Sequence, residues 1–296
     1  MTWPIVQTKI GEKNYPKLLA QISDPPKMLY CRGNLDLLNS ECMGVVGTRK
    51  LTPYGKESAQ YITRGLATAG FTIVSGLAMG IDAVAHQTTL ETGGKTIAVL
   101  GSGVDDKNIG PQINYKLAMD ILKNRGLVTS EYPEGFHANE KTFPQRNRII
   151  SGLSRGVLIV EADKESGALI TAYSALDQNR DVFAVPGSIF SSKSLGPHDL
   201  IKKGAKLIVS AQDIIDEYGH NLHLFDENSN MASPKNPTEQ SIIAILKERG
   251  ETTADEIINE SGLGASQVLS SLSLLEVRGV LKNIGNGKYR STQIKT

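Results

Sequence analysis

Between residues 41 and 218, short apolar runs alternate with longer amphipathic segments, and this pattern indicates the fold of the middle of the chain. Short apolar runs rich in β-branched residues are each followed by a longer segment of helical periodicity. Runs buried on both faces, alternating with helices, predict a doubly wound, mostly parallel α/β sheet. The predicted strands are 43–47, 71–75, 96–101, 127–130, 156–162, 181–186 and 207–209, and the predicted helices are 54–69, 79–92, 112–124 and 168–179.

The segments on either side of residues 41–218 have different patterns. Residues 1–40 carry two proline-bearing turns and predict a short lead-in that packs on the next domain. Residues 219–236 are polar without periodicity, which is typical of a linker. Residues 237–296 predict three short helices followed by a strand, an Asn-Gly turn and a strand, which is a winged-helix arrangement.

Charge and composition narrow the function classes. The 296 residues hold 32 Lys and Arg against 31 Asp and Glu, a net charge of +1, so nucleic-acid binding would require a local basic patch. No apolar run approaches the roughly 20 residues that cross a bilayer, and the first residues do not resemble a signal peptide. The two cysteines, Cys31 and Cys42, exclude a disulfide framework or a structural zinc site. We expect a cytoplasmic protein without a membrane partner.

Two glycine-rich segments resemble cofactor motifs but do not meet the requirements. Gly93-Gly94-Lys95-Thr96 has Thr89 where a phosphate-binding loop needs Gly, and it precedes a predicted strand instead of following one. Gly101-Ser102-Gly103 has Asp106 where a dinucleotide fingerprint has its third Gly. No bound cofactor is expected.

Two predicted strand-to-helix turns have the composition of phosphate sites. Gly47-Thr48-Arg49 ends one strand, and a helix start with its unpaired N–H groups follows it. Thr48 adds a hydroxyl, and Arg49 adds a fork of donors suited to phosphate. The alternative is that Arg49 binds local carbonyl groups. Ser75-Gly76 begins a second turn of the same kind, whose small residues allow a ligand to approach the backbone.

Asp82 and His86 lie four residues apart on the helix after the second turn, and therefore share a helix face. This spacing could serve a metal or an acid–base pair. Without a third ligand, we expect an Asp82–His86 contact that fixes the helix in the fold.

The densest basic signal is Arg146-Asn147-Arg148, which precedes an apolar run. Two arginines separated by one residue can present their guanidinium groups to neighbouring phosphates. The alternative is that one or both of them pair with Glu161 or Asp163 inside the fold.

A third helix start of similar composition follows the strand predicted at 156–162. It contains Ser166, Gly167 and Thr171. Because the carboxyl ends of parallel strands meet at one edge of a sheet, the three turns predict a phosphate-binding rim there.

In order and spacing, these segments resemble the bacterial DNA-processing protein A (DprA/Smf) family from about residue 15 to 215, and the Arg-Asn-Arg-Ile-Ile-Ser-Gly-Leu-Ser block is highly specific. The C-terminal segment is similar to the family's winged-helix domain. The residues that carry the resemblance are Val46-Gly47-Thr48-Arg49, Ser75-Gly76-Leu77-Ala78-Met79-Gly80-Ile81-Asp82, Phe143-Pro144, Arg146-Asn147-Arg148-Ile149-Ile150-Ser151-Gly152-Leu153-Ser154, Ser166-Gly167-Ala168-Leu169-Ile170-Thr171 and Val185-Pro186-Gly187.

The resemblance implies a non-enzymatic protein with an extended Rossmann-like domain and a homodimeric state. It implies binding and protection of single-stranded DNA during natural transformation, and loading of the RecA recombinase onto that DNA. The family's DNA contacts match Thr48, Arg49, Arg146, Arg148 and Lys164 of this sequence.

Two other functions remain open. One is a nucleotide N-glycosidic hydrolase of the related LOG-like fold. The helix that would carry its catalytic Glu has no carboxylate from Leu169 to Ala175, so no acid is placed to assist departure of the base.

The other alternative is a winged-helix regulator with the α/β domain as its sensor. Its presumed recognition helix, residues 266–276, contains no Lys or Arg and is poorly suited to reading the major groove. Basic residues gather instead at the wing, where they predict a secondary DNA contact: Arg278, Lys282, Lys288 and Arg290.

Overall fold

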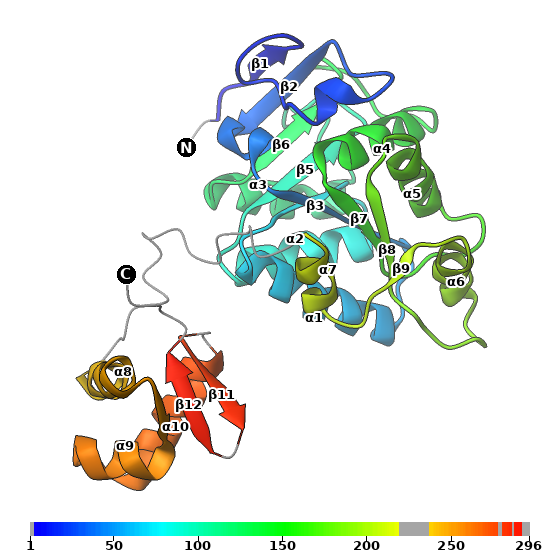
Figure 1. Ribbon diagram of the computed structural model, residues 1–296. Coiled ribbons are helices and arrows are strands. Elements are labelled where there is room, and N and C mark those ends of the chain that lie inside the picture. Colours follow the sequence, from blue (N-terminus) through cyan, green and yellow to red (C-terminus); the bar gives the residue numbers. More distant parts are fainter. Residues whose placement is uncertain (1–2, 219–236, 278–279, 286, 292–296) are drawn as a thin grey trace. The chain divides into compact units, whose positions relative to one another are not determined.

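The computed structural model (Figure 1) describes residues 3–218, 237–277, 280–285 and 287–291. The chain divides into two compact units, Met1–Leu224 and Phe225–Thr296, and each is described by itself. Among the described residues, no helix is both long enough and apolar enough to cross a membrane.

A nine-stranded sheet forms the centre of the first unit, in the order β1-β2-β6-β5-β4-β3-β7-β8-β9. All neighbouring strands are parallel except the pairs β1–β2 and β2–β6. The strands are β1 (Val6–Lys9), β2 (Met28–Gly33), β3 (Cys42–Val46), β4 (Thr72–Ser75), β5 (Thr96–Leu100), β6 (Leu127–Ser130), β7 (Gly156–Ile159), β8 (Asp181–Ala184) and β9 (Lys206–Leu207).

Helices cover both faces of this sheet, which confirms the predicted α/β class (Figure 1). One face carries α1 (Pro53–Thr68), α2 (Ile81–Glu91), α3 (Tyr115–Lys123) and α7 (Ala211–Glu217). The other carries α4 (Thr142–Leu153), α5 (Gly167–Asp177) and α6 (Leu195–Lys202). Short 3-10 turns lie at η1 (Leu19–Gln21), η2 (Leu35–Asn39), η3 (Gln112–Asn114) and η4 (Ser192–Ser194).

The strand order reverses at β3. Strands β4, β5 and β6 follow on one side of it, while β7, β8 and β9 lie on the other. Connections that leave the carboxyl ends of β3 and β7 therefore diverge to opposite sides, which is where doubly wound sheets hold their ligands.

Two strands of this sheet were not predicted. The lead-in contributes β1 and β2, which extend the sheet antiparallel from β6. Three of the four residues of β1 are exposed, as expected of a strand at the sheet edge, and such a strand leaves no continuous apolar run in the sequence.

The second unit has the predicted winged-helix arrangement, with three helices around an apolar core that includes Ile242, Leu246, Leu272 and Leu281. A short strand that was not predicted, β10, pairs with the wing in the order β10-β12-β11. The predicted linker, 219–236, lies outside the described residues. The elements are α8 (Pro237–Arg249), β10 (Glu251–Thr253), α9 (Ala254–Ser261), α10 (Ala265–Val277), β11 (Leu281–Gly285) and β12 (Lys288–Ser291).

His86 fixes α2 against the sheet, but not through the predicted contact with Asp82. Its Nδ1 lies 2.7 Å from the Thr96 hydroxyl of β5, and its side chain is fully buried. Burial, with a smaller contribution from Arg146, lowers the pKa of His86 to about 3. The ring is therefore neutral in the folded protein.

This burial makes stability depend on pH. In the unfolded chain His86 takes up a proton near its ordinary pKa of about 6.5, so stability is lost as the pH falls through that value. Between pH 7.5 and 5.5 we expect this group to reduce the free energy of unfolding by about 1.4 kcal/mol. The His86→Asn variant should lack that part of the pH dependence in urea titrations, whereas a variant at the exposed His137 should retain it. Equal pH dependence in wild type and His86→Asn would contradict this account.

Candidate nucleic-acid interface

The turn after β3 presents two basic side chains to solvent. The Thr48 N–H donates to the Glu161 carbonyl at 2.7 Å, and the Thr48 hydroxyl accepts from the Lys50 N–H at 3.2 Å. Arg49 and Lys50 are both exposed. A Cβ at Gly47 would lie 2.7 Å from the Ile81 side chain, so a larger residue would force this turn away from α2.

Glu161, after β7, holds the start of α1. Its carboxylate accepts from the Thr52 N–H at 2.9 Å and from the Thr52 hydroxyl at 2.6 Å, and the residue is 3% exposed. Neither Arg146 nor Arg148 pairs with it in the described part of the chain, so this alternative for the arginines is not what the structure shows.

Asp82, at the start of α2, joins two of the turns. Its buried carboxylate accepts from the Gly76 N–H at 3.1 Å, and the backbone N–H groups of Ala78 and Gly47 also favour its charged form. Burial raises the pKa of Asp82, while Arg146 and the backbone donors oppose that shift.

Arg146 packs against the Gly76 turn and is 4% exposed. It donates from Nη1 to the Val99 carbonyl at 2.6 Å, and its Nε has no partner in the described part of the chain. Burial lowers the pKa of Arg146 to about 10, an effect that Asp82 opposes and Arg49 increases. The group therefore remains charged at neutral pH.

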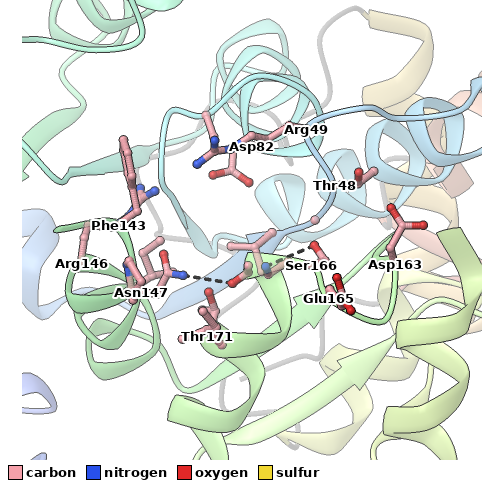
Figure 2. A pocket seen from close by; sticks show the side chains of 18 of the residues that line it. Thr48, Arg49, Asp82, Phe143, Arg146, Asn147, Asp163, Glu165, Ser166 and Thr171 are labelled. Atoms are coloured by element: carbon pink, nitrogen blue, oxygen red, sulfur yellow. Dashed lines mark hydrogen bonds between the residues drawn. The ribbon is translucent and has the colours of Figure 1, made fainter. Parts of the chain in front are cut away.

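Arg49 lies over an aromatic ring. Its guanidinium carbon is 5.2 Å from the centroid of the Phe143 ring, which comes from the first turn of α4. This cation–π pair places a positive charge and an aromatic face beside each other at the cleft (Figure 2).

The start of α5 forms the facing wall. Ser166 caps the helix by accepting from the Ala168 N–H at 3.3 Å. Asn147 of α4 donates to the Gly167 carbonyl at 3.1 Å and so ties the two helices together. The Thr171 hydroxyl, on a residue 1% exposed, points into the space between them (Figure 2).

Together these turns enclose a cleft of about 800 Å³ at the carboxyl ends of β3 and β7, where the strand order reverses. Most of the predicted rim residues line it: Gly47, Thr48, Arg49, Arg146, Asn147, Ser166, Gly167 and Thr171. The cleft is also lined by residues that were not predicted as rim residues, among them Lys50, Glu140, Phe143, Glu165 and Lys193.

Four predicted rim residues do not line the cleft. Ser75 is fully buried and donates to the Val45 carbonyl at 2.6 Å, and Gly76 lies behind Arg146. Lys164 is exposed but is not among the residues that line the cleft. Arg148 pairs with Glu131 at 2.8 Å and with Asp24 at 3.0 Å.

The two arginines separate because α4 is a helix. Residues two apart on a helix point about 200° from each other, so only Arg146 can face the cleft. The expectation that both present guanidinium groups to neighbouring phosphates is therefore not met.

Asp163 and Lys193 form an ion pair at the edge of the cleft, with 2.5 Å between the Lys193 Nζ and a carboxylate oxygen. Lys193 lowers the pKa of Asp163. The cleft is thus not uniformly basic, and its unneutralised cations are concentrated on the side of Arg49 and Lys50.

Of the predicted wing contacts, Lys288 and Arg290 are exposed on the same face of β12. Arg290 lies 3.7 Å from Glu251. Arg278 and the side chain of Lys282 lie outside the described residues.

Comparison with known proteins identifies the family. A family model described as DNA recombination-mediator protein A matches residues 7–219, and one described as the DprA winged helix domain matches residues 228–286. The chain belongs to this family. The resemblance and the fold class predicted from the sequence are both confirmed.

Curated relatives share much of the chain. It is 45% identical over 209 residues to DNA processing protein DprA of Bacillus subtilis, which covers 70% of this chain and 69% of that protein. It is 39% identical over 281 residues to Protein Smf of Escherichia coli, and this match covers 93% of this chain and 75% of that protein.

Two solved structures have the same fold. DNA processing protein A from Streptococcus pneumoniae matches with a TM-score of 0.68 and 44% identity, covering 73% of this chain and 75% of that one. DNA processing protein A from Helicobacter pylori matches with a TM-score of 0.65 and 33% identity, covering 74% of this chain and 98% of that one. Its structure was determined to explain a single-stranded DNA binding mode.

The packing of Gly76 on Arg146 is directly testable. A Cβ at Gly76 would lie 1.7 Å from the Arg146 Nη1, so Gly76→Ala must displace a buried guanidinium from the Val99 carbonyl. We expect a loss of about 1–3 kcal/mol in the free energy of unfolding. Gly167→Ala is the control, because a Cβ there meets nothing within 4 Å. Equal stability of the two variants would show that Arg146 is not held as described.

Proposed function

We propose that this protein binds single-stranded DNA in the cleft between the β3 turn, α4 and α5. The observation that carries the proposal is Arg49 stacked on Phe143, with Lys50 beside it. Binding of single strands requires cations that follow the phosphates and aromatic faces on which splayed bases stack. The single-stranded DNA binding of the H. pylori relative supports the proposal.

We further propose that the protein acts as a recombination mediator, which protects the strand and loads RecA onto it, and that it does so as a homodimer. The family's description as a recombination mediator supports this role. Exposed apolar residues support self-association: Tyr173 and Leu176 on α5, and Leu207 and Val209 at the β9 edge of the sheet.

Salt dependence tests the proposed site. If Arg49 neutralises one phosphate, the affinity for an oligothymidylate should fall with salt, and Arg49→Ala should reduce the slope of log affinity against log salt by about 0.7. Arg64→Ala is the matched control, since Arg64 is exposed near the end of α1, away from the β3 turn.

Anisotropy titrations at several salt concentrations give both slopes. An Arg49→Ala slope equal to that of wild type would exclude Arg49 from the DNA contact. A reduced slope in Arg64→Ala as well would show that the effect reports only net charge.

We also propose that the cleft is not catalytic. Asp82 lines the cleft with a raised pKa, but its carboxylate is buried and accepts from the Gly76 N–H. Glu161 is engaged with Thr52, and the lowered pKa of Asp163 is the opposite of what a general acid requires. Glu140 and Glu165 are exposed, where water reduces their effect on a reacting bond.

Purified protein should therefore release no free base and no phosphate from nucleoside monophosphates above a blank. The measurement is chromatography of the products after prolonged incubation. Turnover that is lost in Glu140→Gln or Glu165→Gln, but kept in the exposed control Glu134→Gln, would support the hydrolase alternative instead.

The winged-helix regulator receives less support. Helix α10 has no Lys or Arg, and the hydroxyl groups of Ser270 and Ser273 donate to carbonyl groups of their own helix at 2.8 and 3.1 Å. A helix without cations and with its hydroxyl donors engaged is poorly equipped to read bases.

A further inference from the structure

The loop between β8 and η4 presents two apolar side chains to solvent. Ile189 is 75% exposed and Phe190 is 93% exposed, the highest value among the large hydrophobic residues of the described chain. Single exposed apolar residues are common on protein surfaces, so the position of this loop decides what the ring can contact.

This loop is held in place by polar contacts. The Ser191 N–H donates to the Ser188 carbonyl at 3.0 Å, and the Phe190 N–H donates to the Ser188 hydroxyl at 3.3 Å. Ser191 in turn accepts from the Lys193 N–H at 3.3 Å. The ring is therefore presented from a hydrogen-bonded turn, without apolar packing of its own.

Both ends of the loop are hydrogen-bonded to segments next to the cleft, the start of α1 and the residues after β7. The Tyr54 hydroxyl, at the start of α1, donates to the Pro186 carbonyl at 2.6 Å. At the other end, the Lys193 carbonyl accepts from the Ala162 N–H at 2.8 Å, and Lys193 itself lines the cleft. Since β8 is parallel to β7, the loop leaves the sheet at the same edge as the turns that form the cleft.

We propose that Phe190 is a base-stacking residue that extends the single-strand path beyond the cleft. This inference rests on the proposed function and adds a second aromatic platform to the one at Phe143. An exposed ring stacks on any base without reading its sequence, and such contacts are worth about 1–3 kcal/mol per base.

The size of the patch favours a nucleobase over a protein partner. A stable protein interface buries about 800 Å² on each side, whereas one aromatic side chain contributes about 150–250 Å². Around Ile189 and Phe190 the chain is polar, with Ser188, Ser191 and Ser192 on either side. Two apolar side chains among serines suffice for a base but not for a protein interface.

Substitution of Phe190 tests the proposal with little risk to folding, because the residue is 93% exposed. In anisotropy titrations with oligothymidylate, Phe190→Ala should bind at least about fivefold more weakly, equivalent to about 1 kcal/mol, with an unchanged salt slope. Phe190→Tyr should bind as wild type does, while Phe190→Leu should bind as weakly as Phe190→Ala. An oligomer of abasic sites should bind equally to wild type and Phe190→Ala.

Fluorescence gives a second readout. The chain has one tryptophan, Trp3, so Phe190→Trp in a Trp3→Phe background places a single indole on the loop. Oligothymidylate should quench this indole, because stacking on a base quenches its emission.

The outcomes separate the two proposals. Wild type that does not bind the oligomer at all would overturn the proposed function. Wild type that binds, with Phe190→Ala equally tight and the introduced indole unquenched, would overturn only the role of Phe190. If light scattering shows a changed oligomeric state in Phe190→Ala, the ring belongs to a protein contact. That result would also overturn the base-stacking role of Phe190.

Discussion

The carboxylate of Asp82 is the group on which the geometry of the cleft depends. It accepts the Gly76 N–H of the β4 turn at 3.1 Å, and the backbone N–H groups of Ala78 in that turn and of Gly47 in the β3 turn favour its charged form. Both turns lie outside helices and strands, so their backbone N–H groups lack the regular hydrogen bonds of secondary structure. A buried acceptor is required to satisfy these N–H groups. A hydrogen bond from the Ile81 N–H to the Thr48 carbonyl, at 3.2 Å, supports the same connection between the start of α2 and the β3 turn.

A buried carboxylate needs a counter-charge, and this explains the position of Arg146. The guanidinium is buried beside Asp82 and bonded to the Val99 carbonyl, where Gly76 leaves just enough room for it. The two arginine-bearing motifs therefore have different tasks. Arg146 is a buried part of the cleft wall, whereas Arg49 is exposed over Phe143, where it can contact a ligand.

The fold was largely predictable because its central strands are buried on both faces, which leaves continuous apolar runs such as Met43 to Val46. The edge strand β1 has no such run. In the site, the glycine-rich turns could be placed at one sheet edge because the alternation of strands and helices predicts parallel strands, whose carboxyl ends meet there. The prediction of Arg148 as a rim residue was wrong, because residues 146–148 are part of a helix and point in different directions. The carboxylates that bind Arg148 are 17 and 124 residues away in the sequence, so the sequence does not show which of them pair with it.

Lys193 and Phe190 were missed for a related reason. Neither belongs to a recognisable motif, and only the parallel pairing of β7 with β8 brings their loop to the same edge as Arg49. Sequence composition identifies small residues at turns well. It does not show which isolated side chains, far apart in the sequence, the strand pairing brings to the same edge of the sheet.

Photo-crosslinking of the full-length protein tests the central claim most directly. A single strand that carries photoreactive thymidine analogues is irradiated on the protein, and the attached peptides are identified by mass spectrometry. The account predicts crosslinks in the segments that line the cleft, at residues 46–50 and 140–150, which should decline in Arg49→Ala. Crosslinks confined to the winged-helix unit, with none in these segments, would contradict it.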